Sequence, residues 1–210
     1  MLEIQDFKKT YNTGFELAIE SLQLQKGIHL IKGENGSGKS TLLKAIAGIH
    51  PFEGEILLSG ISVKAEPVNY RRLVNYSDAE PMFPDFLNLD ELIAFASETK
   101  NAENSQICYL KTKLGIGDFS KNPLSSYSSG MLKKAGLILA FLGNPELIIL
   151  DEPFTTIDVA TQECLRKLIL SAVEDGKSFL ITSHLADFEK LFNYDSILEI
   201  SDGKLKLDHG

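Results

Sequence analysis

Apolar and polar residues alternate along the chain near both of its ends. In residues 2–24 the alternation is interrupted by the turn residues Asn12-Thr13-Gly14, and in residues 196–207 it is interrupted by Asp202-Gly203. A period of two residues places apolar side chains on one face of a strand, so both stretches predict antiparallel strands. The Asp-Gly pair is typical of a hairpin turn. Two more strands are predicted at 54–60 and 73–76.

Three short apolar runs show no such alternation. They lie at 28–31, 147–150 and 179–182, and uninterrupted runs of this length are typical of parallel strands buried on both faces. Apolar residues at helical spacing over 159–173 connect the last two runs, which predicts a parallel crossover unit. Helical patterns also fill much of 83–141, including a helix over 131–142. We therefore predict an α/β fold with a mainly parallel central sheet flanked by helices, an antiparallel β subdomain and a small helical subdomain at about 83–141, all in one domain over 1–210.

Length, composition and charge limit the class of protein. The chain has 210 residues, of which 43% are hydrophobic and 24% charged, as expected of one ordinary α/β domain. Its formal net charge of −8 argues against broad binding to nucleic acid. The longest apolar run, residues 137–142, is far too short to span a bilayer, and the first residues carry no signal peptide. Cys108 and Cys164 have no metal or redox spacing, which favours a reducing cytoplasm.

A glycine-rich segment at 33–41 has the pattern Gly, four residues, Gly-Lys and Ser-Thr, between the predicted strand at 28–31 and a predicted helix. Glycines let the backbone curl so that several N–H groups point at one phosphate, and the helix start adds a partial positive charge. Lys39 is expected to reach the β- and γ-phosphates, and Ser40 is expected to ligate Mg²⁺. The predicted nucleotide contacts in this loop are Asn35, Gly36, Ser37, Gly38, Lys39, Ser40 and Thr41.

Two acids and a histidine follow predicted strands at one edge of the sheet. Asp151 and Glu152 come directly after the run at 147–150, and open α/β sheets bind ligands at the carboxyl ends of their strands. Asp151 is placed to hold Mg²⁺, usually through a water, and Glu152 is placed to activate an attacking water as general base. His184 follows the next buried strand and is expected either to contact the γ-phosphate or to orient the catalytic acid. The predicted catalytic residues are Lys39, Glu152 and His184, and the predicted metal ligands are Ser40 and Asp151.

Small hydroxyl and glycine residues precede the helix predicted over 131–142. Ser128, Ser129 and Gly130 can act as a simple N-cap, or their backbone N–H groups can form a second anion site. The residues alone favour the cap.

Taken together, these motifs resemble the ATP-binding subunits of ABC transporters over essentially the whole chain. The resemblance covers a Walker A loop at 33–41, a Walker B strand at 147–152, a D-loop at 153–158 and a switch-histidine region at 182–184. Residues 127–131 line up with the signature Leu-Ser-Gly-Gly-Gln, and Tyr11 stands where the family places an aromatic ring that stacks on adenine. The resemblance implies a dimer with ATP between the Walker A loop of one subunit and the signature helix of the other, so that Ser128, Ser129 and Gly130 also contact ATP.

The sequence departs from the family pattern at two motifs. The signature has Tyr127, Ser129 and Met131 in place of Leu, Gly and Gln. The Q-loop has no Gln: counting from the preceding strand puts Ala79 at that position, and a shift of one residue would put Asp78 or Glu80 there. A carboxylate could approach Mg²⁺ from this position, whereas alanine could not.

The resemblance implies an ATP-binding and ATP-hydrolysing subunit that drives a separate transmembrane permease subunit, as a homodimer or with a second ATP-binding subunit. ATP and Mg²⁺ are the expected cofactors, and nucleic acid is not an expected partner. The expected location is the cytoplasm, at the inner face of the cell membrane and held there only by the partner. Two alternatives stay open, namely a soluble ABC-type ATPase outside transport and a weakly hydrolysing regulatory nucleotide binder. A neighbouring gene that encodes several apolar segments of about 20 residues would favour the transporter.

Overall fold

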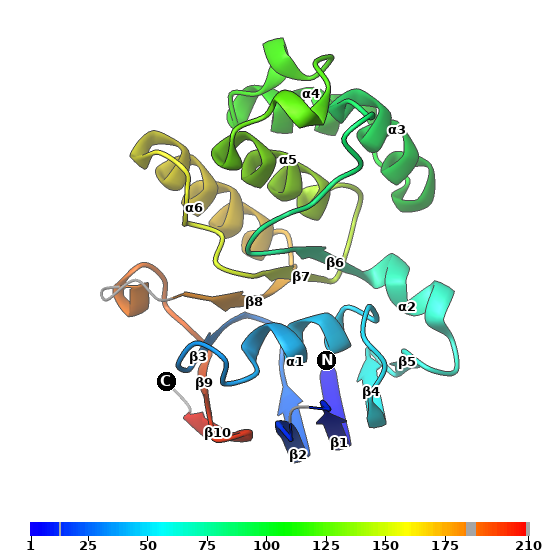
Figure 1. The fold of residues 1–210 in the computed structure, drawn as a ribbon, viewed down its shortest axis with the longest axis vertical. Helices are drawn as coiled ribbons and strands as arrows, with labels where there is room; N and C mark the ends of the chain where they lie inside the picture. Colours follow the sequence, from blue (N-terminus) through cyan, green and yellow to red (C-terminus); the bar gives the residue numbers. More distant parts are fainter. Residues whose placement is uncertain (13, 184–187, 209–210) are drawn as a thin grey trace.

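The computed structural model describes residues 1–12, 14–183 and 188–208, and within them the strands form one ten-stranded sheet (Figure 1). The order across the sheet is β5-β4-β1-β2-β10-β9-β3-β8-β7-β6. In chain order the strands are β1 (Leu2–Thr10), β2 (Glu16–Leu24), β3 (Ile28–Lys32), β4 (Glu53–Leu58), β5 (Ile61–Ser62), β6 (Val74–Ser77), β7 (Leu147–Leu150), β8 (Ser178–Thr182), β9 (Ser196–Ser201) and β10 (Lys204–Asp208).

The sheet has an antiparallel part and a parallel part, which confirms the predicted fold class. Strand β1 pairs antiparallel with β2 and β4, and β4 pairs antiparallel with the short β5. Strands β3, β8, β7 and β6 are parallel neighbours, and β9 is parallel to β3. The β9–β10 hairpin connects the two parts, because β10 also pairs with β2. The carboxyl ends of β3, β7 and β8 therefore meet at one edge, where the sequence places its candidate chemistry.

The helices occupy two regions of the molecule (Figure 1). In chain order they are α1 (Lys39–Ile46), α2 (Pro67–Leu73), α3 (Leu89–Lys100), α4 (Asn104–Lys113), α5 (Ser129–Phe141) and α6 (Val159–Glu174), with 3₁₀ turns at Gly117–Phe119, Leu124–Ser126 and Phe188–Lys190. Helices α3, α4 and α5 gather at one end of the molecule, beyond the edge strand β6 and its neighbour β7, and form the helical subdomain. Helix α1 lies over the sheet beside β3.

Two helices differ from the sequence prediction. The helix expected over 131–142 begins at Ser129, because the Ser128 side chain caps it by accepting the Met131 N–H at 3.3 Å. Helix α2 has no counterpart in the prediction. It is seven residues long and buries only Tyr70, so it shows no helical period of apolar residues, although Pro67 favours a helix start.

Two apolar clusters cover opposite faces of the parallel strands. In β7, Ile148 and Leu150 belong to the cluster that includes α5 and α6, whereas Leu147 and Ile149 belong to the cluster that includes α1 and the antiparallel strands. All four side chains are fully buried. The uninterrupted apolar runs therefore have a structural cause, since neither face of these strands meets water.

Candidate functional site

The loop between β3 and α1 leaves the start of the helix open. Gly38 is the N-cap residue of α1 and has a φ of 112°, a conformation that glycine adopts without strain. A Cβ atom at this position would also lie 3.1 Å from the Phe15 ring. No side chain of the described residues caps α1, so the first N–H groups of the helix are available to an anion, which the helix dipole favours.

Lys39, the first residue of α1, is only 6% exposed, and its side chain folds back over the loop. Its Nζ donates to the carbonyl oxygen of Gly33 at 2.7 Å and to that of Glu34 at 2.9 Å. Burial lowers the pKa of Lys39, and the charges of Glu152 and Asp151 oppose this shift. The ammonium group therefore lies within the electrostatic reach of both acids.

Strand β8 orients the two acids at the end of β7. Thr182 Oγ1 donates to Asp151 Oδ1 at 2.6 Å and accepts the N–H of Glu152 at 2.8 Å. On the other side, the Tyr76 hydroxyl donates to Asp151 Oδ2 at 3.5 Å. Burial, and then the charge of Asp151, raise the pKa of Tyr76, so this hydroxyl stays protonated and acts as a donor. Asp151 is 1% exposed and Glu152 is 8% exposed, so both acids are almost removed from bulk water.

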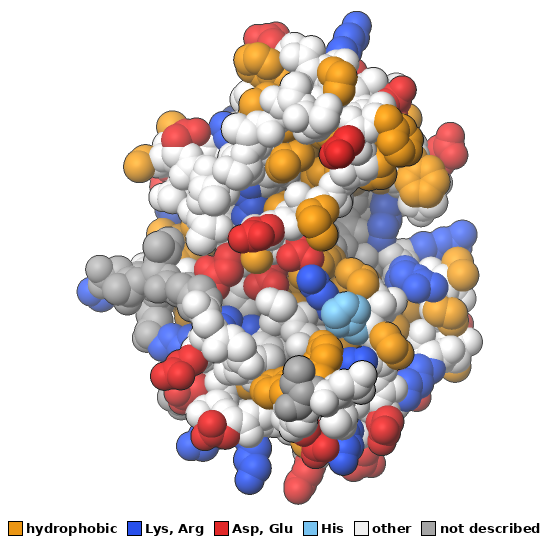
Figure 2. Space-filling model, viewed as in Figure 1, with side chains coloured by type: hydrophobic (Ala, Val, Ile, Leu, Met, Phe, Trp, Pro, Cys, Tyr) orange, Lys and Arg blue, Asp and Glu red, His pale blue; other side chains and the backbone are white. Residues whose placement is uncertain are grey.

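A cavity of about 420 Å³ lies between the loop, the two acids and the end of the β1–β2 hairpin. The rings of Tyr11 and Phe15 are 6.2 Å apart, and the Tyr11 hydroxyl lies 3.1 Å from Thr41 Oγ1. Figure 2 shows acidic side chains gathered around a hollow in the middle of this face. The described residues that line the cavity are Tyr11, Phe15, Asn35, Gly36, Gly38, Lys39, Ser40, Thr41, Ala79, Asp151 and Glu152. Aromatic rings, loop N–H groups, an ammonium and two carboxylates thus share one cavity, a combination suited to a nucleoside triphosphate.

Some predicted site residues lie outside this lining. Ser128 and Ser129 are exposed at the start of α5 and Gly130 follows them, but no described residue of α5 lines the cavity. Ser37 lines a neighbouring hollow of about 620 Å³ on the other side of the loop. His184 lies outside the described residues. The structure therefore brings together the phosphate loop, the acids and Tyr11, and it leaves the signature segment apart from them.

The three Q-loop alternatives have different surroundings. Ala79 lines the cavity. The carboxylate of Asp78 pairs with Lys44 at 2.7 Å, and Glu80 is exposed. The residue at the cavity wall thus has no side-chain oxygen for a metal ion.

Three parts of the site were not assigned from the sequence. Phe15 faces Tyr11 across the hairpin turn, where the Tyr11 N–H donates to the Phe15 carbonyl at 2.9 Å. A second aromatic residue four positions after Tyr11 was the available signal. Tyr76 and Thr182 contact Asp151 from the neighbouring strands β6 and β8, and only the pairing of these strands with β7 brings them there.

The fold and the cavity define the class: an α/β protein in which a phosphate loop and two paired acids line one cavity suited to a nucleoside triphosphate. The sequence profile of the ABC transporter family matches residues 19–155, and the chain belongs to this family. It is an ATP-binding and ATP-hydrolysing subunit of an ABC transporter. A non-transport ATPase and a weakly hydrolysing regulator, the two alternatives left open by the sequence, are not favoured.

Relatives of the chain agree with this assignment. The lantibiotic transport ATP-binding protein SrtF of Streptococcus pyogenes is 29% identical over 99% of this chain and 90% of its own length. A solved ATP-binding subunit of an ABC transporter has a TM-score of 0.90 at 24% identity and covers 100% of this chain and 90% of its own. A dimeric post-hydrolysis ATP-binding cassette with bound ADP and Pi has a TM-score of 0.84 at 19% identity, with 100% and 98% covered. These two structures share the fold. In the described part of the chain, no helix has the length and apolar character needed to cross a membrane.

Proposed function

We propose that this subunit binds ATP with Mg²⁺ in the cavity beside α1, and that two cassettes close around the nucleotide to drive a transmembrane permease subunit. The observation that carries the proposal is that one copy holds the phosphate loop and both acids in a single cavity, while the signature-like start of α5 lies outside it. A second cassette, identical or different, would supply that missing wall. The 210 residues would act as one domain, because one sheet connects both parts.

The cavity residues have distinct proposed roles in binding. Lys39 would exchange the carbonyls of Gly33 and Glu34 for the β- and γ-phosphates, since both partners are neutral backbone oxygens. The loop N–H groups would hold the same phosphates. Tyr11, with Phe15 beside it, would stack on the adenine ring.

The oxygen donors in the cavity fit Mg²⁺. Ser40 supplies a hydroxyl and Asp151 a carboxylate, and the described residues contain no cluster of three or more His, Cys, Asp or Glu side chains that could enclose an ion. Few protein ligands suit Mg²⁺, which keeps several waters and phosphate oxygens around it. When bound, the ion would neutralise charge that develops on the transferred phosphoryl group. Thr182 and Tyr76 would hold the Asp151 carboxylate in one orientation by donating to both of its oxygens.

Glu152 is the proposed general base. It lines the cavity directly after Asp151, and its φ of 47° places it in the left-handed region, where a residue other than glycine is strained. Strain of this kind persists where the surroundings fix a side chain for a task. His184 keeps its proposed role, contact with the γ-phosphate or orientation of the acid, on the resemblance alone.

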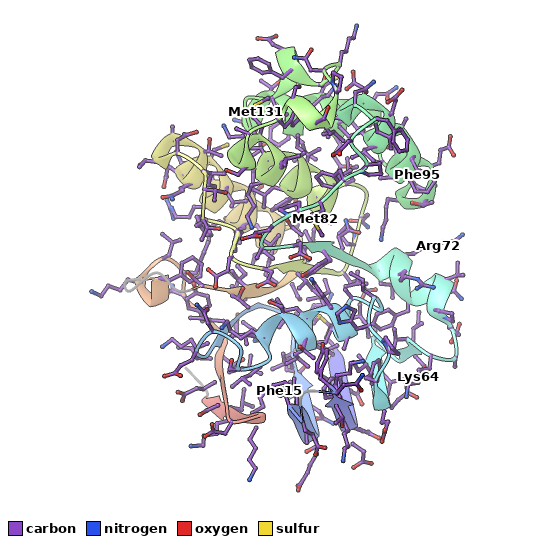
Figure 3. The ribbon with its side chains drawn as sticks, viewed as in Figure 1. Phe15, Lys64, Arg72, Met82, Phe95 and Met131 are labelled. Atoms are coloured by element: carbon purple, nitrogen blue, oxygen red, sulfur yellow. The ribbon has the colours of Figure 1, made fainter. Side chains whose placement is uncertain are left out.

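The partner surface is proposed on the segment between β6 and α3. A groove of about 280 Å³ is lined there by Ile49, Pro81, Met82, Phe83 and Leu139, among others. Met82 is 93% exposed and Phe86 is 84% exposed. Figure 3 shows Met82 where the chain runs from β6 toward the helical subdomain, below Phe95 of α3. Exposed apolar groups that gather in one place mark interaction sites. A permease bound here would hold the subunit at the cytoplasmic face of the membrane.

Co-purification from membranes tests the partner. Met82→Glu should reduce the amount of membrane protein recovered with the tagged subunit, while Tyr109→Glu, at an exposed position on α4, should not. Both variants should retain ATP binding. Full recovery with Met82→Glu would place the contact elsewhere, and a wild-type subunit that brings down no membrane protein would contradict the permease.

A further inference from the structure

Lys133 is a completely buried lysine on α5 that does not line the nucleotide cavity. Its Nζ donates to three backbone carbonyl oxygens, those of Asp78 at 3.0 Å, Ala79 at 2.9 Å and Asp151 at 2.9 Å. An ammonium group has three N–H donors, so every donor is used. Two of the acceptors belong to the segment after β6, and the third belongs to the end of β7.

Burial of the charged Lys133 amine costs free energy, which its hydrogen bonds must offset. Burial lowers the pKa of Lys133 to about 8, and the charges of Asp151, Asp78, Glu152 and Glu80 oppose the shift. An unbranched apolar side chain could fill the same space without desolvation of a charge. The polar contacts therefore need a reason beyond the filling of volume.

Helix α5 is packed closely against the segment that Lys133 contacts. One turn along, a Cβ atom at Gly136 would lie 2.9 Å from Pro81 Cγ and 3.1 Å from Ser77 Oγ, so the helix backbone approaches residues 77–81 directly. At the end of the helix, Asn75 Nδ2 donates to the carbonyls of Ala140 and Leu142 at 2.9 and 2.8 Å. Helix α5 thus contacts β6 and the segment after it at three places along its length: at Lys133, at Gly136 and at its carboxyl end.

We infer that Lys133 is a positioning residue for ATP hydrolysis, which joins the wall of the cavity at Ala79 to the backbone of Asp151 and both to helix α5. This role of Lys133 depends on the proposed roles of Asp151 and Glu152. A shift of α5 would be transmitted through one ammonium group to the acids, because the carbonyl of Asp151 directly precedes the N–H of Glu152 that Thr182 accepts. Without the ammonium group, these three carbonyls lose a donor, and the two segments are free to separate.

The test is ATP turnover per nucleotide-binding site. Lys133→Met keeps an unbranched side chain of similar length but removes all donors, and we expect kcat per titrated site to fall roughly tenfold or more, with KM for ATP and nucleotide affinity close to wild type. Lys133→Gln has only two N–H donors, and its kcat should lie between that of wild type and that of Lys133→Met. Lys113→Met, at an exposed position on α4, removes the same charge and should stay within about twofold of wild type.

Normalisation to titrated sites separates positioning from a general loss of folded protein, which would lower the number of sites but not the turnover of each one. Wild-type turnover per site in Lys133→Met overturns the inference. If that variant does not fold, wild-type turnover per site in Lys133→Gln overturns it. Glu152→Gln is measured alongside: normal hydrolysis in that variant would overturn the assignment of the base, which is a result distinct from any obtained at Lys133.

Discussion

Lys39 shows how much of the candidate site depends on single side chains. Its ammonium group is held by two neutral carbonyls of its own loop, and a triphosphate would be a much stronger partner. We predict that Lys39→Ala lowers ATP affinity by at least tenfold, about 1.4 kcal/mol. Titration with a fluorescent nucleotide measures this, with Lys64→Ala, at an exposed position that does not line the cavity, as the control. Unchanged affinity in a folded Lys39→Ala variant would remove Lys39 from the site.

Glu152 gives the second prediction at this scale. Glu152→Gln preserves the shape of the side chain and removes the base, so turnover should fall by roughly 10² or more while ATP still binds. The variant should also accumulate as an ATP-bound dimer, which size-exclusion chromatography detects. Glu174→Gln, an exposed change at the end of α6, should hydrolyse normally. If Glu152→Gln does so too, the general base is a different residue.

The sequence was sufficient for site residues that belong to a local motif, and it was insufficient for residues that reach the site through tertiary structure. Lys39 belongs to the glycine-rich motif at 33–41 and Asp151 directly follows the run at 147–150, so their positions could be inferred from a few neighbours. Thr182 lies 31 positions after Asp151 and contacts it only because β8 pairs with β7. Nothing in the local pattern around Lys133 shows that its amine is fully buried.

Strands whose side chains are buried on both faces could be predicted from the sequence, whereas a helix that buries little could not. The runs in β3, β7 and β8 are covered on both faces and are therefore mainly apolar, with His29 and Thr182 as buried polar exceptions. Helix α2 escaped detection because it buries a single side chain. The Q-loop position could not be fixed by counting, because Asp78, Ala79 and Glu80 are adjacent, and which of them meets the cavity depends on how the chain leaves β6.

Asn75 tests the contact between β6 and α5. Its buried amide satisfies two carbonyls at the end of the helix, where no further turn can do so. Asn75→Ala should lower the free energy of unfolding by about 2 kcal/mol, since two buried acceptors lose their donor. Urea denaturation measures the change, and Asn69→Ala, exposed on α2, should stay within about 0.5 kcal/mol of wild type. An equal stability of Asn75→Ala and wild type would show that water replaces the amide.

At the scale of the whole molecule, most of the predicted site segments line one cavity, whereas the start of α5 does not. One cavity receives residues from the β1–β2 hairpin, the phosphate loop, the segment after β6 and the end of β7. Ser128 instead caps α5 at an exposed position. The order of the motifs along the chain predicted the family, which the comparisons confirm. In the proposed dimer, the exposed helix start of a second cassette completes the site.

The last prediction tests that shared site. Ser128→Arg should abolish hydrolysis and spare ATP binding, because the phosphate-loop contacts stay intact while a bulky side chain blocks the one site that its own helix start faces. A mixed dimer of Ser128→Arg with Lys39→Ala would contain one site made only of wild-type halves, namely the phosphate loop of the first subunit and the helix start of the second. Activity in the mixture, with none in either parent, would therefore indicate a site shared between subunits. Ser105→Arg, an exposed serine-to-arginine change on α4, controls for the added charge and should remain active. If Ser128→Arg keeps full ATPase activity, residues 127–131 serve only to begin a helix, and the two-subunit site is lost.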